Sequence, residues 1–528
     1  MTVLSAAEES APDQAGPTRR RVLQGAAVVA AAAALPMAAA APAQAATTGS
    51  SFLPASARLH LLRRATYGPS PSALADVTRL GLSGWVEWQL QPSLISDTAV
   101  SAMLAKLPVP SDGTAISTVK AKLDAGTISG WDQFMSIPKA HLIRATWSRR
   151  QLLTVMEELW SDLFNVAVPH DGTNESRAHY QYTIRSKALG RFDDLLWSIT
   201  RHPAMLTYLN NRDSDRFAPN ENQGRELLEL HSVGVDAGYT EDDIKNAARV
   251  LTGMSVNNDT GEFQYKPGMH WVGPVTVFGF SAGNDTEGGG EAVSKALVLY
   301  LARHPKTAHR VAYRIAQRFV SDDPPEPLVA SLARTYTANR TAIAPVLRQL
   351  FASAEFAASR GLKVRRPVEH VAATLRALQV GPDTGDGGSI NTLLWTAGAM
   401  GQQPFAWSTP DGFPERAENW LSTATTLERW SASRRLVEGW GTGDLGRADL
   451  RAWLFGSATA TPATYGDMVD IASKKLFYRV LPSEHRTAVC TFLGARPLSP
   501  LSTDSSALTW RLRSWVSLLL DTPYHLYR

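Results

Sequence analysis

The sequence has almost no cysteine, and it has no hydrophobic run of bilayer length after its first 45 residues. Cys490 is the only cysteine among 528 residues. This excludes an intramolecular disulfide and any zinc or iron–sulfur site built from several cysteines. Beyond residue 45 no stretch approaches the roughly 20 apolar residues that a membrane-spanning helix needs. We therefore expect no membrane span in that part of the chain.

Signals for nucleic-acid and nucleotide binding are also missing. The 53 basic and 49 acidic residues give a net charge of +4 and form no long basic run. A nucleic-acid-binding protein usually has a concentrated basic surface, so we exclude nucleic acid as a partner. The chain contains no nucleophile elbow, no P-loop and no dinucleotide-binding fingerprint at the required spacing.

The first 45 residues have the pattern of an export signal. Thr18, Arg19 and Arg20 precede Leu23, an alanine-rich run follows, and small residues end the segment at Ala45. This order is typical of the twin-arginine route, which exports folded proteins. We expect cleavage after Ala45 and a mature protein in the periplasm, outside the cell or on its surface. An alanine-rich membrane anchor that is kept after synthesis is the alternative.

Apolar residues recur at helical spacing almost throughout the chain from residue 50 onward, whereas strand signals are scarce. The best strand signal, at 262–280, predicts one small β-hairpin. We predict a mainly α fold, a large multi-helix assembly with that single hairpin. The glycine-rich segment at 381–389 suggests two lobes. The predicted regions are the signal at 1–45, an N-terminal helical region at 46–380 and a C-terminal helical region at 381–528.

Two adjacent helices are best defined by their capping signals. Asn220 and Gln223 predict a capping box that opens a helix reaching about Ser232. Thr240 and Asp243 predict a second capping box, which opens a helix that a glycine ends. Together these segments predict a helical hairpin with a glycine-rich connection.

The first of these helices carries the candidate catalytic residues. Asn222, Glu226 and Glu229 are spaced to line one polar stripe, and Arg225 lies beside it. Two neighbouring carboxylates can divide acid and base duties or hold a divalent cation. We therefore predict all four as catalytic, with the two carboxylates reacting and the other two side chains orienting them. An internal ion network is the alternative. The cofactor is unknown, a divalent metal remains open, and no metal ligand is assigned.

The segment at 402–419 has too many prolines for regular structure and too many aromatic residues for a solvated linker. We expect it to pack down or to line a site, because aromatic rings bind sugar faces. Core packing is the alternative for most of the 15 tryptophans. The predicted substrate contacts are Trp407, Phe413, Asp411 and Gln403 in this segment, and His270 in the expected hairpin turn.

Several blocks together resemble the DUF1800 family of exported bacterial proteins, whose activity is unassigned. The resemblance runs from about residue 55 to the C-terminus, and it implies a DUF1501-type partner, itself similar to sulfatases and alkaline phosphatases. The blocks are HLLRRATYGPS (60–70), LLWSITRHPAMLTYLNN (195–211), PNENQGRELLELHSVGV (219–235), YTEDDIKNAARVLTGM (239–254), RRPVEH (365–370) and QQPFAWSTPDGFP (402–414).

The chain departs from the family pattern at two places. Where the family usually has W-x-N-H-F, this chain has Asp162 and then Leu163, so the histidine is absent. Where H-D is usual after the predicted helical hairpin, it has His270 and Trp271. Two polar positions of the family are therefore occupied by apolar side chains.

Two functions from different classes remain open. The first is an extracytoplasmic, carboxylate-dependent hydrolase that acts on a polymer or glycan. The alternative is a non-catalytic secreted subunit that binds a DUF1501-type protein.

Overall fold

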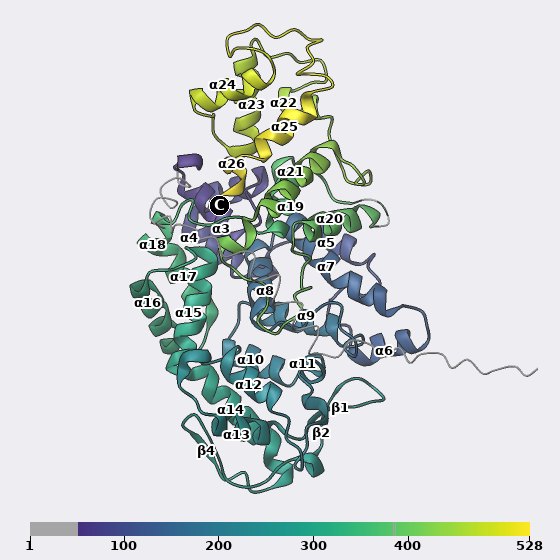
Figure 1. Ribbon diagram of the computed structural model, residues 1–528, viewed down its shortest axis with the longest axis vertical. Coiled ribbons are helices and arrows are strands. Elements are labelled where there is room, and N and C mark those ends of the chain that lie inside the picture. Colours follow the sequence, from purple (N-terminus) through teal and green to yellow (C-terminus); the bar gives the residue numbers. More distant parts are fainter. Residues whose placement is uncertain (1–50, 384, 386) are drawn as a thin grey trace, which may run out of the picture. The chain divides into compact units, whose positions relative to one another are not determined.

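Helices make up nearly all the regular structure in the computed structural model, which describes residues 51–383, 385 and 387–528 (Figure 1). The predicted export signal at 1–45 lies outside these residues. The mainly α fold expected from the apolar spacing is confirmed. None of the helices in the described ranges combines the length and hydrophobicity that crossing a bilayer requires.

The first half of the described chain contains the helices α3 (Ala57–Ala65), α4 (Pro71–Gln89), α5 (Thr98–Leu104), α6 (Ile116–Asp124), α7 (Gly130–Trp147), α8 (Gln151–Leu163), α9 (Arg177–Lys187), α10 (Phe192–Thr200), α11 (Pro203–Tyr208), α12 (Glu221–Glu229) and α13 (Glu241–Leu251). The second half contains α14 (Gly290–Arg303), α15 (Pro305–Phe319), α16 (Glu326–Ala338), α17 (Ile343–Ala352), α18 (Ala354–Ala358), α19 (Pro367–Ala377), α20 (Gly388–Ala399), α21 (Thr423–Glu438), α22 (Leu450–Phe455), α23 (Tyr465–Phe477), α24 (Ser483–Phe492), α25 (Leu512–Leu520) and α26 (Pro523–Leu526).

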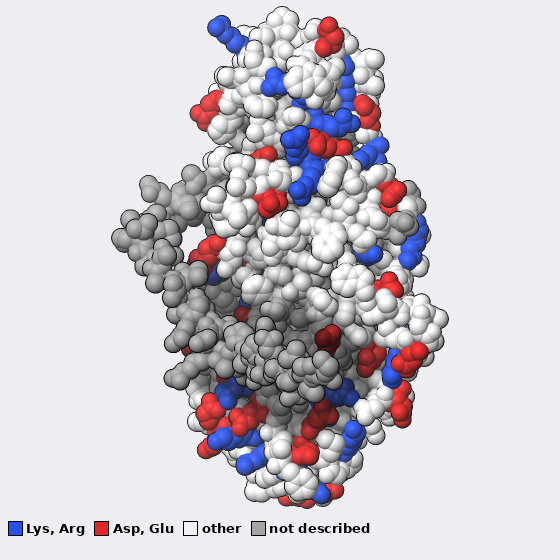
Figure 2. All heavy atoms as spheres, turned by 45° about the vertical axis from the view of Figure 1, so that its right-hand side comes forward, with Lys and Arg blue, Asp and Glu red and all other residues white. Residues whose placement is uncertain are grey.

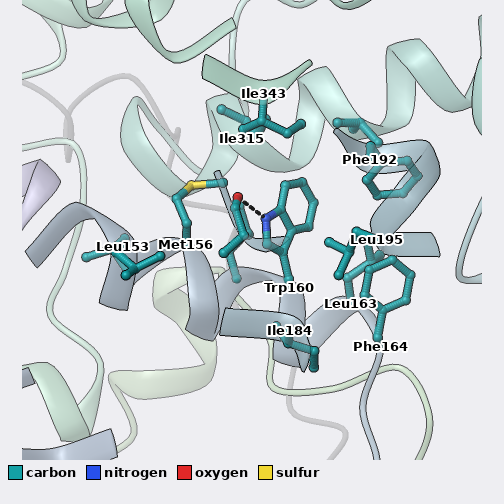
Figure 3. Close-up of a cluster of buried hydrophobic side chains, with 14 of the residues drawn as sticks. Leu153, Met156, Trp160, Leu163, Phe164, Ile184, Phe192, Leu195, Ile315 and Ile343 are labelled. Carbon is teal, nitrogen blue, oxygen red and sulfur yellow. Dashed lines mark hydrogen bonds between the residues drawn. The ribbon is translucent and has the colours of Figure 1, made fainter. Parts of the chain in front are cut away.

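The main hydrophobic core surrounds α8, every residue of which is buried. Figure 3 shows Trp160 of this helix among Phe192, Ile315 and Ile343, which come from three other segments. The indole is fully buried, and its N–H donates a hydrogen bond of 2.8 Å to the carbonyl oxygen of Ala188. A buried indole N–H needs such a partner, so this bond fixes how α8 sits in the core.

A second hydrophobic cluster lies in the C-terminal part of the chain, where Met468, Leu476 and Trp515 from α23 and α25 pack together. The described residues on both sides of Gly381 belong to one compact unit. The division into an N-terminal and a C-terminal region at this glycine stays a prediction.

The structure has two small antiparallel sheets in the described ranges, and the single predicted hairpin is wrong in its pairing. Strand β2 (Phe263–Tyr265) pairs with the preceding β1 (Met254–Val256), and β3 (Val275–Val277) pairs with β4 (Phe280–Ala282). Phe278 and Gly279, between β3 and β4, both have positive φ angles of 45° and 88°. Positive φ at both central residues suits a two-residue hairpin turn, so β3 pairs with the strand that follows it.

The two predicted helices of the hairpin are present, but only the second opens with a capping box. Thr240 and Asp243 form the predicted reciprocal bonds at the start of α13. At the start of α12 the Asn220 side chain accepts from the N–H of Asn222 instead, and the Gln223 amide donates to the Thr200 carbonyl at 2.5 Å. The expected capping box is therefore wrong, because a buried tertiary hydrogen bond takes the Gln223 side chain.

A glycine in α12 allows the two helices of the hairpin to approach closely. A Cβ atom at Gly224 would lie 2.9 Å from the Ala248 nitrogen and 3.1 Å from the Ile244 carbonyl oxygen. Both atoms belong to the backbone of α13, which a side-chain rotation cannot move. The position of α12, and of its carboxylates, thus depends on the absence of a side chain here.

We predict that Gly224→Ala lowers the free energy of unfolding by about 1–3 kcal/mol, because overpacking outweighs the better helix propensity of alanine. The matched control is Gly84→Ala in α4, where the added Cβ would meet only the Leu80 Cβ at 3.6 Å. Urea denaturation should show a gain of up to about 1 kcal/mol for this control. Equal effects of the two substitutions would contradict the close approach.

Candidate functional site

Arg225 is the centre of an ion cluster on α12 and α13. Its guanidinium lies 3.4 Å from a Glu221 oxygen, 3.5 Å from Glu229 and 2.9 Å from Glu241. The Tyr239 hydroxyl also bonds to Glu229. This part of the polar stripe fits the ion-network alternative, because the Glu229 carboxylate already has two partners.

Glu226 has a different environment from its neighbour on the same helix. Its side chain is half-buried and has no ion pair or hydrogen bond within the part of the chain that the structure describes. Burial raises the pKa of its carboxyl, and the nearby Glu229 and Asp411 raise it further, while Arg225 opposes them. A carboxyl with a raised pKa can keep a proton and donate it, which is what a general acid requires.

The aromatic segment at 402–419 packs onto the helices instead of extending into solvent. The Asn165 amide donates to the carbonyl oxygens of Trp407 at 2.8 Å and Thr409 at 2.7 Å. The Tyr208 hydroxyl donates to the Ser408 carbonyl at 2.8 Å. Burial, Asp411 and Glu226 raise the pKa of this tyrosine to about 12. These hydrogen bonds therefore fix the segment close to the Glu226 carboxylate of α12.

At Gly412 the backbone of the aromatic segment lies directly against the end of α8. Its φ angle is 71°, and a Cβ atom there would lie 2.0 Å from the Asp162 carbonyl oxygen. No other residue could take this place without moving one of the two backbones. Phe413 follows directly, and its ring packs on Trp407 with centroids 5.2 Å apart.

The segment and the helices enclose a pocket of about 410 Å³, which we call the aromatic pocket. Its wall includes Trp407, Asp411 and Phe413, three of the predicted substrate contacts. Asp411 accepts hydrogen bonds from the Trp407 indole at 2.9 Å and from the Thr409 hydroxyl at 2.5 Å. The other lining residues are Leu163, Leu230, Arg310, Arg314, Gly412, Pro414 and Asn419.

Two arginines of α15 give the aromatic pocket a positive charge. Arg310 and Arg314 are one helical turn apart, and neither forms an ion pair with any residue in the described ranges. Arg310 donates from Nε to the Leu230 carbonyl at 3.2 Å, and the Arg314 Nε is buried without a partner. Burial and the neighbouring Arg314 lower the pKa of Arg310 to about 10. Unneutralised guanidinium groups at a pocket wall are suited to an oxyanion.

A fully buried ion network lies behind the pocket. We define it as Arg318, Lys363, Arg366 and Arg528 with Glu158, Asp162, Glu369 and Glu415. Arg318, one turn beyond Arg314 on α15, lies 2.9 Å from Glu158, 2.7 Å from Glu369 and 2.7 Å from Glu415. The network therefore joins α8, α15 and α19 to the end of the aromatic segment.

The cations of the network keep most of its carboxylates ionised despite their burial. Burial alone would raise the pKa of Glu415, but Arg318, Arg366 and Lys363 lower it well below the usual range. Asp162 differs, because burial together with Glu158 and Glu415 raises its pKa to about 6 against the effect of Arg366. At neutral pH the four basic side chains thus balance four carboxylates.

The pocket and the network share the same two pieces of chain. Asp162 belongs to the network, and Leu163 lines the pocket. Phe413 lines the pocket, and Glu415, two residues later, belongs to the network. The wall of the aromatic pocket is therefore supported directly by buried charges.

The other predicted site residues, including Arg225, Glu226 and Glu229 of α12, are not part of the lining of the aromatic pocket. Asn222 donates to the Leu209 carbonyl at 3.4 Å, and Gln403 is half-buried outside the pocket lining. His270 is fully buried, with one ring nitrogen 2.9 Å from the Thr252 carbonyl and the other 2.8 Å from the Asn284 amide oxygen. Their predicted roles in catalysis and substrate binding stay predictions.

The sequence patterns did not reveal Arg310, Arg314 or most of the ion network. The two arginines could have been noticed from their spacing of four residues on a helix, followed four residues later by Arg318. The residues at 51–383, 385 and 387–528 contain no group of three or more His, Cys, Asp or Glu arranged to hold a metal ion. A divalent cation at the two carboxylates stays untested.

We predict that Glu415→Gln lowers the free energy of unfolding at neutral pH by about 3–5 kcal/mol, because it leaves Arg318 and Lys363 short of a buried counter-charge. The folded-state pKa of Glu415 is depressed, so its contribution is present above pH 4.5 and is lost as the pH falls below that value. The stability difference between the variant and the wild type should therefore shrink in acid.

Urea denaturation followed by tryptophan fluorescence at neutral and acidic pH measures both effects. The control is Glu418→Gln on the same segment, where the exposed carboxylate pairs with Arg416 at 3.1 Å. Its effect should stay within about 0.5 kcal/mol. A Glu415→Gln protein as stable as the control variant at neutral pH would show that the network contributes no stability.

Comparison with known proteins bears on the sequence blocks. No curated protein and no solved structure matches the chain. The model of one protein family, DUF1800, described as a protein of unknown function, matches residues 60–527. This match includes every block quoted above, the aromatic pocket and all of the ion network except Arg528. The chain therefore belongs to the DUF1800 family.

Proposed function

We propose that this protein is a carboxylate-dependent hydrolase that cleaves an anionic polymer or glycan in the aromatic pocket. One observation carries the proposal. Asp411 in the wall of the aromatic pocket is close enough to Glu226 of α12 to raise the pKa of the Glu226 carboxyl, and Leu230, the residue that follows α12, lines the same pocket. Glu226 and Asp411 also both raise the pKa of Tyr208, so the two carboxylates lie near the same tyrosine.

The two carboxylates divide the chemical roles. Glu226 donates its proton to the leaving oxygen as the scissile bond to that oxygen breaks. Asp411 accepts a proton from the attacking water, whose oxygen forms the new bond, so both protons are accounted for. Glu229 acts through Glu226, because its charge raises the pKa of that carboxyl, and Arg225 holds Glu229 in place. Asn222 positions α12 through its bond to Leu209.

The pocket favours a substrate with a ring and a negative group. Trp407 and Phe413 present aromatic surface for a sugar ring, while Arg310 and Arg314 lack a protein counter-charge. On the face shown in Figure 2, acidic and basic side chains are interspersed and form no broad area of one sign. This face therefore has no broad positive surface that would attract an anion, and the anionic group of the substrate binds to Arg310 and Arg314.

Leu163 supports this location for the site. It lines the aromatic pocket at the position where the family resemblance places a histidine. The twin-arginine pattern of the first 45 residues supports an exported protein, for which an extracellular polymer is an accessible substrate.

We predict that Glu226→Gln lowers kcat on a cleaved polymer at least about a hundredfold, the usual scale of general acid catalysis. The assay measures new reducing ends from polygalacturonate, alginate and the neutral polymer dextran. Because the pKa of Glu226 lies above 4.5 and the acid must be protonated, wild-type activity should fall as the pH rises through that pKa. The variant should lose this alkaline limb.

Glu484→Gln, an exposed carboxylate on α24, is the matched control and should keep wild-type activity. A folded Glu226→Gln protein with unchanged turnover would refute the acid role. Cleavage of dextran in preference to both acidic polymers would refute the role of the two arginines.

The second candidate function is a partner subunit for a DUF1501-type protein. Three exposed tryptophans favour it: Trp395 of α20, Trp430 of α21 and Trp440 just after α21, which are 57%, 49% and 66% exposed. The two helices pack on each other. Tryptophan is enriched at the centres of protein interfaces, so this surface suits a protein partner.

If the chain binds such a partner, the two proteins should elute together in size-exclusion chromatography after co-expression. Trp440→Ala should weaken the complex at least about tenfold, the scale of an interface hot spot. Trp510→Ala, at a tryptophan beside α25 that is 78% exposed, is the control and should leave the complex intact. Separate elution of the two wild-type proteins would exclude this candidate.

A further inference from the structure

A cavity with a volume of about 790 Å³ lies among α3, α4, α17 and α18. We call it the apolar pocket. Its wall is formed mainly by Leu61, Leu82, Val86, Phe351 and Phe356. Cavities that bind small molecules have this size and are mostly apolar with a few placed polar groups. Neither proposed function uses it, although His60 in its wall opens the first family block, HLLRRATYGPS.

The apolar pocket contains one basic side chain without a counter-charge. Arg348 is neutralised by Glu87 through two hydrogen bonds of 2.5 and 2.9 Å. Arg360 has no hydrogen bond or ion pair with any described residue, and its Nε is buried. A buried donor without a partner is costly, so an anionic group of a ligand would find a strong binding contact here.

His60 in the pocket wall lies close enough to Arg64 and Arg360 for both cations to lower the pKa of its imidazole. Its Nε2 lies 2.7 Å from the Phe356 carbonyl, which assigns the proton to this nitrogen and leaves Nδ1 buried without a partner. Burial, together with the nearby Arg64 and Arg360, lowers the pKa of the imidazole to about 3 against the opposing effect of the bond to Phe356. The histidine is therefore neutral, and it supplies no negative charge to balance Arg360.

We propose that the apolar pocket binds a long-chain aliphatic carboxylate, with the hydrocarbon tail against the leucine and phenylalanine wall and the carboxylate on Arg360. A sugar would leave its hydroxyl groups unpaired against this wall. A neutral lipid would bury its tail equally well but would leave Arg360 without a partner. This site is separate from the aromatic pocket and does not depend on the hydrolase proposal.

Three probes test the proposal on the full chain by titration calorimetry: hexadecanoate, the uncharged hexadecanol and the short carboxylate acetate. We expect hexadecanoate to bind at one site per chain, at least about tenfold more tightly than hexadecanol, because of the charge-assisted bond to Arg360. Acetate, which lacks the tail, should not bind measurably.

Three variants locate the site. Arg360→Gln should weaken hexadecanoate binding about tenfold and leave hexadecanol binding unchanged. Ala357→Trp places an indole in the pocket from an exposed position of α18 and should abolish binding of both probes. Arg334→Gln, an exposed arginine on α16 outside the pocket, is the matched control and should bind as the wild type does.

Two results would overturn the proposal. Equal affinity for hexadecanoate and hexadecanol, unchanged by Arg360→Gln, would remove the role of the cation. Hexadecanoate binding that survives Ala357→Trp would place the fatty acid elsewhere on the protein. Circular dichroism of each variant identifies any loss of binding that comes from misfolding.

Discussion

The buried ion network is the constraint on which the rest of the structure depends. Arg318 cannot be buried without counter-charges, and its three carboxylates come from α8, α19 and the end of the aromatic segment. These parts of the chain can therefore pack only in an arrangement that brings all of the charges together. Packing around Trp160 buries α8 in the hydrophobic core, and the ion network fixes the positions of the segments that surround this helix. The aromatic pocket is a consequence of this arrangement.

Local patterns predicted the parts of the fold that local interactions decide. The helices follow from apolar spacing, and the capping box of Thr240 and Asp243 involves residues three apart. The capping box at Asn220 was wrong because the Thr200 carbonyl, which belongs to another helix, takes the Gln223 side chain. The single hairpin was wrong because β2 pairs with the strand before it and β3 with the strand after it. A local sequence pattern does not show which of two possible partners a residue will bond to, because that choice depends on where the fold places each partner.

For the candidate site, local patterns likewise predicted individual residues but not which of them lie close together. Glu226 was predicted from its helix, and Trp407, Asp411 and Phe413 from the composition of their segment, but nothing local placed the two groups beside each other. Arg366 and Asp162 pair at 2.8 Å across 204 positions, and Arg318 and Glu415 at 2.7 Å across 97. Pairs this distant cannot be recognised from one sequence, because any of its 53 basic residues could supply the counter-charge. The fold, and not the motif, selects the partner.

The contact between Gly412 and the Asp162 carbonyl has a thermodynamic consequence. It joins the pocket wall to the charged core through two backbones in direct contact, with no flexible side chain between them. A ligand that binds only when this wall is in place stabilises the folded state by mass action, and its affinity appears as a rise in Tm that grows with ligand concentration. The Tm of this protein therefore reports how much of the pocket is occupied by ligand, and measuring it requires no reaction product.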